Sequence, residues 1–150
     1  MPAAREGEPG APFDMVVELG KIREFARATK SANPEYLSDD HPVSPATFLA
    51  TSTFWQGPES IPVGAGFTNY ERVLHGAQEF IFFGEPPRAG TKLTVQARPG
   101  PTYEKTGRRG GVMKFAELVT EYRDEAGRLV AEAHGTVIET SQPPSAEVSS

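Results

Sequence analysis

A chain of 150 residues has room for one domain with one substantial core. The net charge of −5, without any basic block, disfavours nucleic-acid binding because little is available to neutralise phosphates. The absence of cysteine removes disulfides, thiolate metal sites and a cysteine nucleophile together. The three histidines, His41, His75 and His134, are too widely spaced for a metal-ligand pattern, so we expect neither a metal nor a cofactor.

Both ends of the chain are polar and rich in proline, with little apolar surface to offset the entropy of ordering. We predict disordered tails at residues 1–12 and 141–150, on either side of a single domain at residues 13–140. No segment approaches the run of about 18 apolar residues that spans a bilayer. The N-terminus also lacks the basic-then-apolar order of a secretory signal. We therefore expect a cytoplasmic protein that does not bind membranes.

The first half of the domain predicts two helices. Residues 20–29 carry one apolar face at helical spacing, and Asn33-Pro34 is expected to stop this helix. The apolar positions are Ile22, Phe25, Ala26 and Thr29. A second helix is predicted from Ser44-Pro45, where serine can cap and proline suits the first turn, to Phe54 and Trp55. This second helix is apolar on most sides, which is typical of a buried helix.

The second half changes to the alternating period of β-strands. Residues 92–98 alternate strictly, and residues 74–83, 112–122 and 129–138 are three further strand candidates. The hairpin turns are predicted at residues 109–111 and 124–127, whereas the glycines of residues 62–66 indicate only a loop. Because the apolar helix must be covered, we predict an α+β domain in which a curved antiparallel sheet wraps around it, as in the hotdog fold.

Three stretches resemble the MaoC-like hydratase/dehydratase family. Residues 75–80 (HGAQEF) and 85–93 (EPPRAGTKL) are similar to its strand–turn–strand segment, and residues 115–136 are similar to its strand, turn and returning strand. Residues 45–48 (PATF) match the Pro-x-Thr-Phe opening of the central helix in N-terminal-type domains. The resemblance covers residues 14–140. It implies a hotdog fold and reversible addition or removal of water across the α,β bond of an acyl thioester.

The same resemblance exposes a departure at the catalytic positions. Active members carry an Asp and a His in a pattern like Gly-Asp-x-Asn-Pro-x-His after the first helix. Here Ser31 and Tyr36 occupy those positions around Asn33-Pro34. Neither suits the proton transfers, because serine without a base is a poor acceptor and tyrosine has a pKa near 10. His41, beside two aspartates, is the substitute base that the chain offers, against the alternative of a solvated turn.

Without the Asp/His pair, this chain resembles the non-catalytic subunits of heterodimeric (3R)-hydroxyacyl-thioester dehydratases. It implies a substrate that is an acyl-CoA or acyl-carrier-protein thioester, and a homodimer or a heterodimer with an Asp/His-containing hotdog subunit. An acyl-CoA-binding or scaffolding hotdog protein without turnover stays open, and a hotdog thioesterase ranks last. The loop at residues 37–44 is shorter than is common in the family, so the identity of the substrate is not carried over.

Several residues are candidates for binding the substrate. The backbone N–H groups at the start of the central helix could hold the thioester oxygen, against the alternative of an ordinary helix start capped by Ser44. His75 and Gly76 could face the acyl pocket, although a satisfied histidine within a sheet is the simpler interpretation. Four aromatic residues could line an acyl tunnel or form part of the core: Phe54, Trp55, Phe80 and Phe82. The full set of substrate-binding candidates is Asn33, Ala46, Thr47, Phe48, His75 and Gly76.

Overall fold

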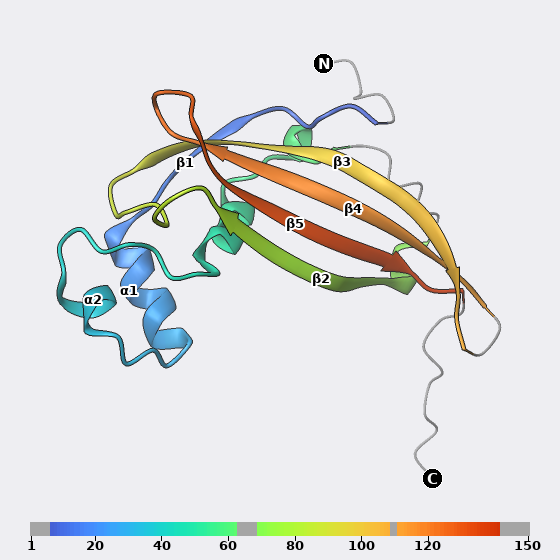
Figure 1. The fold of residues 1–150 in the computed structure, drawn as a ribbon, viewed down its shortest axis with the longest axis horizontal. Coiled ribbons are helices and arrows are strands. Elements are labelled where there is room, and N and C mark those ends of the chain that lie inside the picture. Colours follow the sequence, from blue (N-terminus) through green and yellow to red (C-terminus); the bar gives the residue numbers. More distant parts are fainter. Residues whose placement is uncertain (1–6, 63–68, 109–110, 142–150) are drawn as a thin grey trace, which may run out of the picture.

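The computed structural model describes residues 7–62, 69–108 and 111–141, and it shows one curved sheet with the α-helices at one end (Figure 1). The five strands are antiparallel and follow the order β1-β3-β4-β5-β2. Their bounds are β1 Phe13–Val16, β2 Val73–Phe82, β3 Lys92–Thr106, β4 Val112–Arg123 and β5 Leu129–Glu139. The α+β fold predicted from the sequence is confirmed.

Strand register divides the sheet into two chemically different faces. Val95, Tyr122 and Ala131 are aligned across β3, β4 and β5, and each is at most 2% exposed. Because side chains alternate along a strand, the residues directly before and after each of these three point to the opposite face of the sheet. Arg98, Glu121, Glu132 and His134 lie on that opposite face. We call the two surfaces the inner face and the outer face.

Two helical segments, α1 and η1, pack against the inner face. The helical segments in chain order are α1 (Leu19–Ala28), α2 (Pro34–Ser38) and the 3₁₀ helices η1 (Phe48–Phe54), η2 (Pro58–Ser60) and η3 (Tyr70–Arg72). Ile22 of α1 and Phe48 and Leu49 of η1 belong to the same buried cluster as Leu93 and Val95 of β3. The ring of Phe48 also meets that of Phe25 edge-on, with centroids 5.8 Å apart. Apolar burial against the sheet therefore fixes the position of η1.

The central helix differs from its prediction in type and in exposure. It is a 3₁₀ helix that begins at Phe48, and Thr47 rather than Ser44 precedes its first residue. The helix is also not buried all round, because Phe54 is 82% exposed. Two features disfavour an α-helix here: hydroxyl-bearing residues have weak helix propensity, and the Thr53 hydroxyl donates back to the Ala50 carbonyl at 3.2 Å.

The first helix ends before Asn33-Pro34, as predicted, and Asn33 has the extended backbone expected before a proline; the same two residues also begin a second helix. The first helix ends at Ala28, and Lys30 then adopts a φ of 56°. The Asn33 side chain accepts a hydrogen bond from the Glu35 N–H, and Pro34 occupies the first turn of α2. The same residue pair that disfavours helix on its N-terminal side favours it on its C-terminal side.

The sheet gains an edge strand that the sequence did not predict. β1 pairs with β3 through Phe13 to Val16 and has only four residues, too few to show a clear period. The pairing continues upstream, since the Gly10 N–H donates to the Ala97 carbonyl at 2.9 Å. Residues 7–12, within the predicted N-terminal tail, thus follow the edge of the sheet, while residues 1–6 and 142–150 lie outside the described residues. The domain limits stay a prediction.

The turn between β4 and β5 forms at the predicted residues. Gly127 has a φ of 79°, a left-handed conformation that glycine adopts without steric cost. The Asp124 carboxylate accepts hydrogen bonds from the backbone N–H groups of Ala126 and Arg128, both at 3.0 Å. These bonds, with that of the Arg128 guanidinium, lower the pKa of Asp124. The other predicted turn and the glycine loop include residues 109–110 and 63–66, outside the described part of the chain.

Candidate functional site

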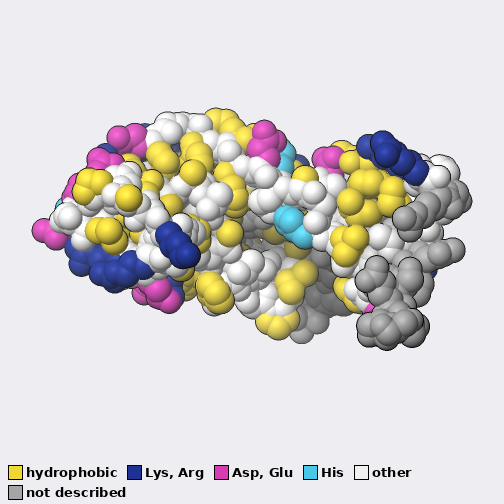
Figure 2. Space-filling model, turned by 90° about the horizontal axis from the view of Figure 1, so that it is seen from below, with side chains coloured by type: hydrophobic (Ala, Val, Ile, Leu, Met, Phe, Trp, Pro, Cys, Tyr) yellow, Lys and Arg dark blue, Asp and Glu magenta, His cyan; other side chains and the backbone are white. Residues whose placement is uncertain are grey.

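A cavity of about 540 Å³ lies between η1 and the inner face of the sheet. Its lining comes from β1, η1, β2, β4 and β5, so segments far apart in the sequence build one site. The lining residues are Phe13, Thr47, Ala50, Ser52, Thr53, Gln56, His75, Gln78, Phe80, Leu118, Thr120, Tyr122 and Ala133. Figure 2 shows the molecule from below Figure 1, with a hollow between the two ends and a histidine at its rim.

Strand pairing forms the sheet side of this cavity. Phe80, Ala133 and Thr120 are paired across β2, β5 and β4 and therefore share the inner face. Gln78 pairs with Gly135 in the same way, and a Cβ added at Gly135 would lie 3.4 Å from the Gln78 Oε1. Small residues on β5 thus leave space between the longer side chains of β2 and β4.

A buried hydroxyl pair connects η1 to the sheet. The Tyr122 hydroxyl lies 3.0 Å from the Ser52 hydroxyl and donates to the Leu49 carbonyl at 3.1 Å. Burial raises the pKa of Tyr122 above its ordinary value of 10, and the hydrogen bond with Ser52 opposes that rise. The phenol is therefore neutral near pH 7 and acts as a hydrogen-bond donor to the helix backbone.

The structure brings two of the predicted substrate-binding residues into the cavity. Thr47 and His75 line it, and Gly76 lies beside His75 at a β-bulge. A Cβ at Gly76 would come within 2.6 Å of the Ile138 Cδ1, so the glycine relieves crowding within the sheet. Ala46 is exposed and does not line the cavity.

Phe48 and Asn33 have structural roles. Phe48 is 1% exposed, and its N–H donates to the Pro45 carbonyl at 2.9 Å, so this N–H is not free for an oxyanion. Ser44 is not the predicted cap, because its hydroxyl is buried without a partner among the described residues. Asn33 caps α2 and does not line the cavity.

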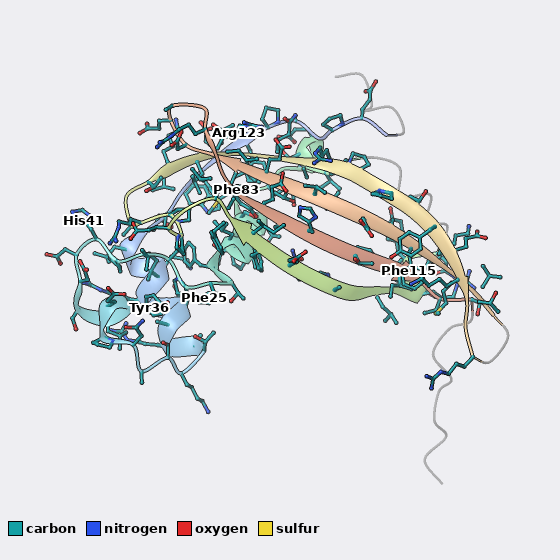
Figure 3. The ribbon with its side chains drawn as sticks, viewed as in Figure 1. Phe25, Tyr36, His41, Phe83, Phe115 and Arg123 are labelled. Atoms are coloured by element: carbon teal, nitrogen blue, oxygen red, sulfur yellow. The ribbon has the colours of Figure 1, made fainter. Side chains whose placement is uncertain are left out.

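None of the three residues considered for catalysis lines the cavity, and Figure 3 shows Tyr36 and His41 at the helical end of the molecule. The Ser31 hydroxyl accepts a hydrogen bond from the Asn33 N–H at 3.3 Å. Tyr36, on α2, packs against the buried cluster. His41 is exposed, and the Asp39 carboxylate accepts its backbone N–H at 2.8 Å rather than its imidazole. These three residues are therefore not assembled with His75 and Tyr122, the titratable residues of the lining.

The four aromatic residues that were expected to line an acyl tunnel or to form part of the core lie in different places. Phe80 lines the cavity and Phe82 packs against the buried cluster. Phe54 and Trp55 instead border a smaller pocket of about 290 Å³ on the far side of η1, where the Lys21 ammonium lies 5.9 Å from the centre of the Phe54 ring. The predicted aromatic set does not form a single tunnel, because η1 turns two of its members away from the sheet.

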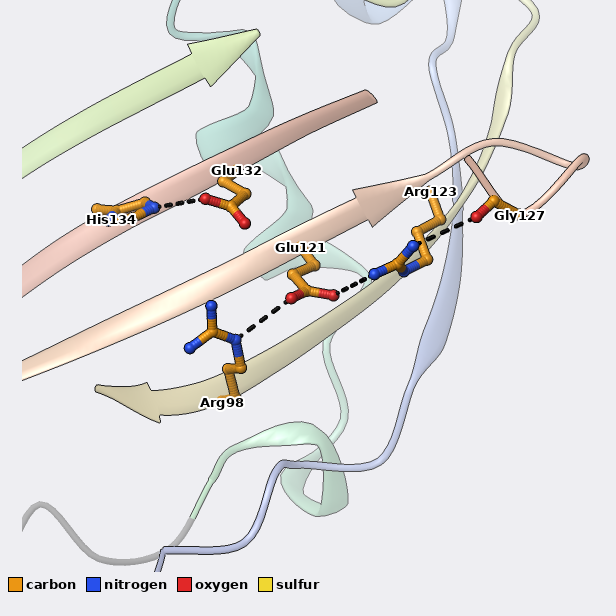
Figure 4. A network of polar contacts seen from close by, with 6 residues as sticks. All are labelled: Arg98, Glu121, Arg123, Gly127, Glu132 and His134. Atoms are coloured by element: carbon orange, nitrogen blue, oxygen red, sulfur yellow. Dashed lines mark hydrogen bonds and ion pairs between the residues drawn. The ribbon is translucent and has the colours of Figure 1, made fainter. Parts of the chain in front are cut away.

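The outer face carries paired charges (Figure 4). Glu121 accepts hydrogen bonds from Arg123 at 2.8 Å and Arg98 at 3.3 Å, and His134 lies 2.8 Å from Glu132. Among the described residues, no group of three or more His, Asp or Glu side chains could hold a metal ion. Nor does this part of the chain contain a helix of the length and apolarity needed to cross a membrane.

A curved antiparallel sheet with a central helix on its inner face and a cavity between them is the arrangement of a hotdog protein. The model of the FAS1-like dehydratase domain region matches residues 4–133. This chain therefore belongs to the FAS1-like dehydratase family, and the solved structures that it resembles include MaoC-like dehydratases.

Proteins of known sequence or structure from two bacteria are similar to this chain. The UPF0336 protein SCO4636 of Streptomyces coelicolor is 35% identical over 137 residues, which cover 86% of each chain. A chain of the HadBC (3R-hydroxyacyl-ACP dehydratase) complex of Mycobacterium tuberculosis is 25% identical with a TM-score of 0.66, over 89% of this chain and 96% of that one. The ChsH1–ChsH2 complex of the same organism shares the fold, with 16% identity, a TM-score of 0.68 and coverage of 94% and 88%.

Proposed function

We propose that this chain is the acyl-binding subunit of a (3R)-hydroxyacyl-thioester dehydratase and that a second hotdog chain supplies the Asp/His pair. The composition of the cavity carries the proposal. Among the described residues, its lining contains a buried tyrosine and one histidine but no carboxylate, while water addition and removal need a positioned base and acid. Ser31 and Tyr36, at the family's catalytic positions, do not line it either.

The open edge of the sheet supports a partner subunit. β2 is the last strand in the sheet order, and six consecutive residues from Leu74 to Glu79 are exposed. An edge strand with six consecutive exposed residues is a template for pairing with another strand. His75, Gln78 and Phe80 of β2 also line the cavity, so a chain paired with this edge would lie beside the bound acyl group. The complexes HadBC and ChsH1–ChsH2, each of two kinds of chain, show that relatives of this fold assemble in pairs.

The decisive experiment measures hydration of crotonyl-CoA and longer enoyl-CoA thioesters, followed as loss of the conjugated thioester absorbance. We expect no turnover by the purified chain alone and clear turnover after addition of an Asp/His-bearing hotdog chain from the same organism. Turnover by the chain alone would refute the proposal, and His41→Ala and His75→Ala would then identify the base. Acyl-CoA binding without turnover in any combination would instead indicate a scaffolding protein, and release of free CoA would indicate a thioesterase.

A further inference from the structure

Several polar side chains of the cavity make no hydrogen bond with another described residue. Thr47, His75, Gln78 and Thr120 all line the cavity, and none of them makes a side-chain hydrogen bond with the described part of the chain. Ser52 and Tyr122 differ, because they bond each other and the Leu49 carbonyl. The cavity therefore has an apolar part, a satisfied hydroxyl pair and a set of free polar groups.

Three of the free groups lie on opposite sides of a shallow trough. Gln78 and His75 come from β2 and Thr120 comes from β4, while β5 runs between them with Ala133 and Gly135 on the inner face. Adjacent strands lie about 4.8 Å apart, so β2 and β4 are about 10 Å apart. A linear chain lying along β5 would pass within reach of both sets of polar groups.

A saturated alkyl chain would leave these groups without partners. When a ligand displaces water from a polar side chain and offers no hydrogen bond, the lost bond weakens binding. The Gln78 amide, the His75 imidazole and the Thr120 hydroxyl can each form a hydrogen bond with an oxygen of a ligand. Hydroxyl and carbonyl groups are the ligand groups that match this set.

We infer that the cavity takes an acyl chain that carries hydroxyl or keto oxygens beyond its reacting carbons, in preference to a plain alkyl chain. This inference rests on the proposed acyl-binding function and names its substrate class. The amides of a pantetheine arm offer the same hydrogen-bonding chemistry from the carrier side. The test therefore has to distinguish binding of oxygens on the acyl chain from binding of the amide oxygens on the pantetheine arm.

The test is calorimetric binding to the full chain of decanoyl-CoA, of decanoyl-CoA with a hydroxyl at C5, C7 or C9, and of pantetheine alone. One added neutral hydrogen bond predicts about three- to tenfold tighter binding of at least one hydroxylated thioester than of decanoyl-CoA. Gln78→Leu or Thr120→Val, each close in size to the original residue, should abolish that preference. Glu79→Gln, on the next residue of β2 but on the outer face, should preserve it.

Two results would overturn the inference while leaving acyl binding intact. One is equal or tighter binding of decanoyl-CoA by the unaltered chain. The other is binding of pantetheine alone that Gln78→Leu weakens, without any preference among the acyl groups, because the polar groups would then serve the carrier arm. Failure of every thioester to bind would instead overturn the proposed function. Retention of cooperative thermal unfolding shows that each variant is folded.

Discussion

The phenol oxygen of Tyr122 lies 3.0 Å from the hydroxyl of Ser52, although the two residues are 70 positions apart. Tyr122 is on the central strand β4 and Ser52 is on η1, so this contact joins the helix to the sheet at the wall of the cavity. Because Tyr122 also donates to the Leu49 carbonyl, one side chain holds two turns of the 3₁₀ helix. The shape of the cavity depends on this connection.

Tyr122→Phe should therefore destabilise the protein by about 1–3 kcal/mol, since it leaves buried hydrogen-bonding groups on η1 without their partner. Urea unfolding followed by circular dichroism measures the change in the free energy of unfolding. Tyr70→Phe is the matched control, because Tyr70 is 82% exposed and should tolerate the same change without loss. Equal stability of Tyr122→Phe and the unaltered chain would show that the contact contributes nothing.

The raised pKa of Tyr122 predicts a loss of stability at high pH. As the pH passes the ordinary value of 10, the tyrosine of the unfolded chain loses its proton while the buried phenol keeps it. The unfolded state then binds fewer protons, so stability falls as the pH rises towards the folded pKa. We expect the stability difference between the unaltered chain and Tyr122→Phe to be constant up to about pH 9 and to narrow above pH 10. A constant difference up to pH 11 would contradict the raised pKa.

The lowered pKa of Glu121 predicts a loss of stability at low pH, whereas the raised pKa of Tyr122 predicts a loss at high pH. Its hydrogen bonds with Arg123, and next with Arg98, hold the pKa of this carboxyl below its ordinary value of 4.5. The stabilisation is present above pH 4.5 and is lost as the pH falls through the folded pKa. Glu121→Gln should cost about 0.5–1 kcal/mol at pH 7, as expected for a partly exposed pair, and nothing once the carboxyl is protonated. Unfolding free energies from pH 7 to pH 3 measure this, and a loss that persists in acid would point to packing instead.

The sequence could predict the fold better than the site. The four long strands were predicted from residues 74–83, 92–98, 112–122 and 129–138, whereas β1 has only four residues, too few to show a period. His75 and Thr47 were found as candidates, but Gln78 and Thr120 were missed because only strand register brings β2 and β4 to one cavity. The signal available was the alternation itself, which places Gln78 with Phe80, and Thr120 with Tyr122, on the inner face.

A larger side chain on β5, between β2 and β4 in the cavity, should block acyl binding. Ala133 lines the cavity on β5, and Ala133→Leu adds bulk between β2 and β4 where the acyl chain is proposed to lie. We expect the affinity for decanoyl-CoA to fall at least tenfold, measured by calorimetry. Thr136→Leu is the matched control, since it makes a similar change on the outer face of the same strand. Unchanged binding by Ala133→Leu in a folded protein would place the acyl site elsewhere.

The exposed edge of β2 predicts where the partner subunit binds. Leu74, near the start of this edge strand, is 56% exposed, and Leu74→Lys would place a charge where a second strand has to approach. We expect the dissociation constant of the assembly to rise at least tenfold, measured by sedimentation velocity, with loss of the hydratase activity that the partner confers. Val16→Lys is the matched control, because Val16 is 38% exposed on β1 at the opposite edge. If Val16→Lys dissociates the assembly and Leu74→Lys does not, the partner pairs with the β1 edge, away from the β2 residues that line the cavity.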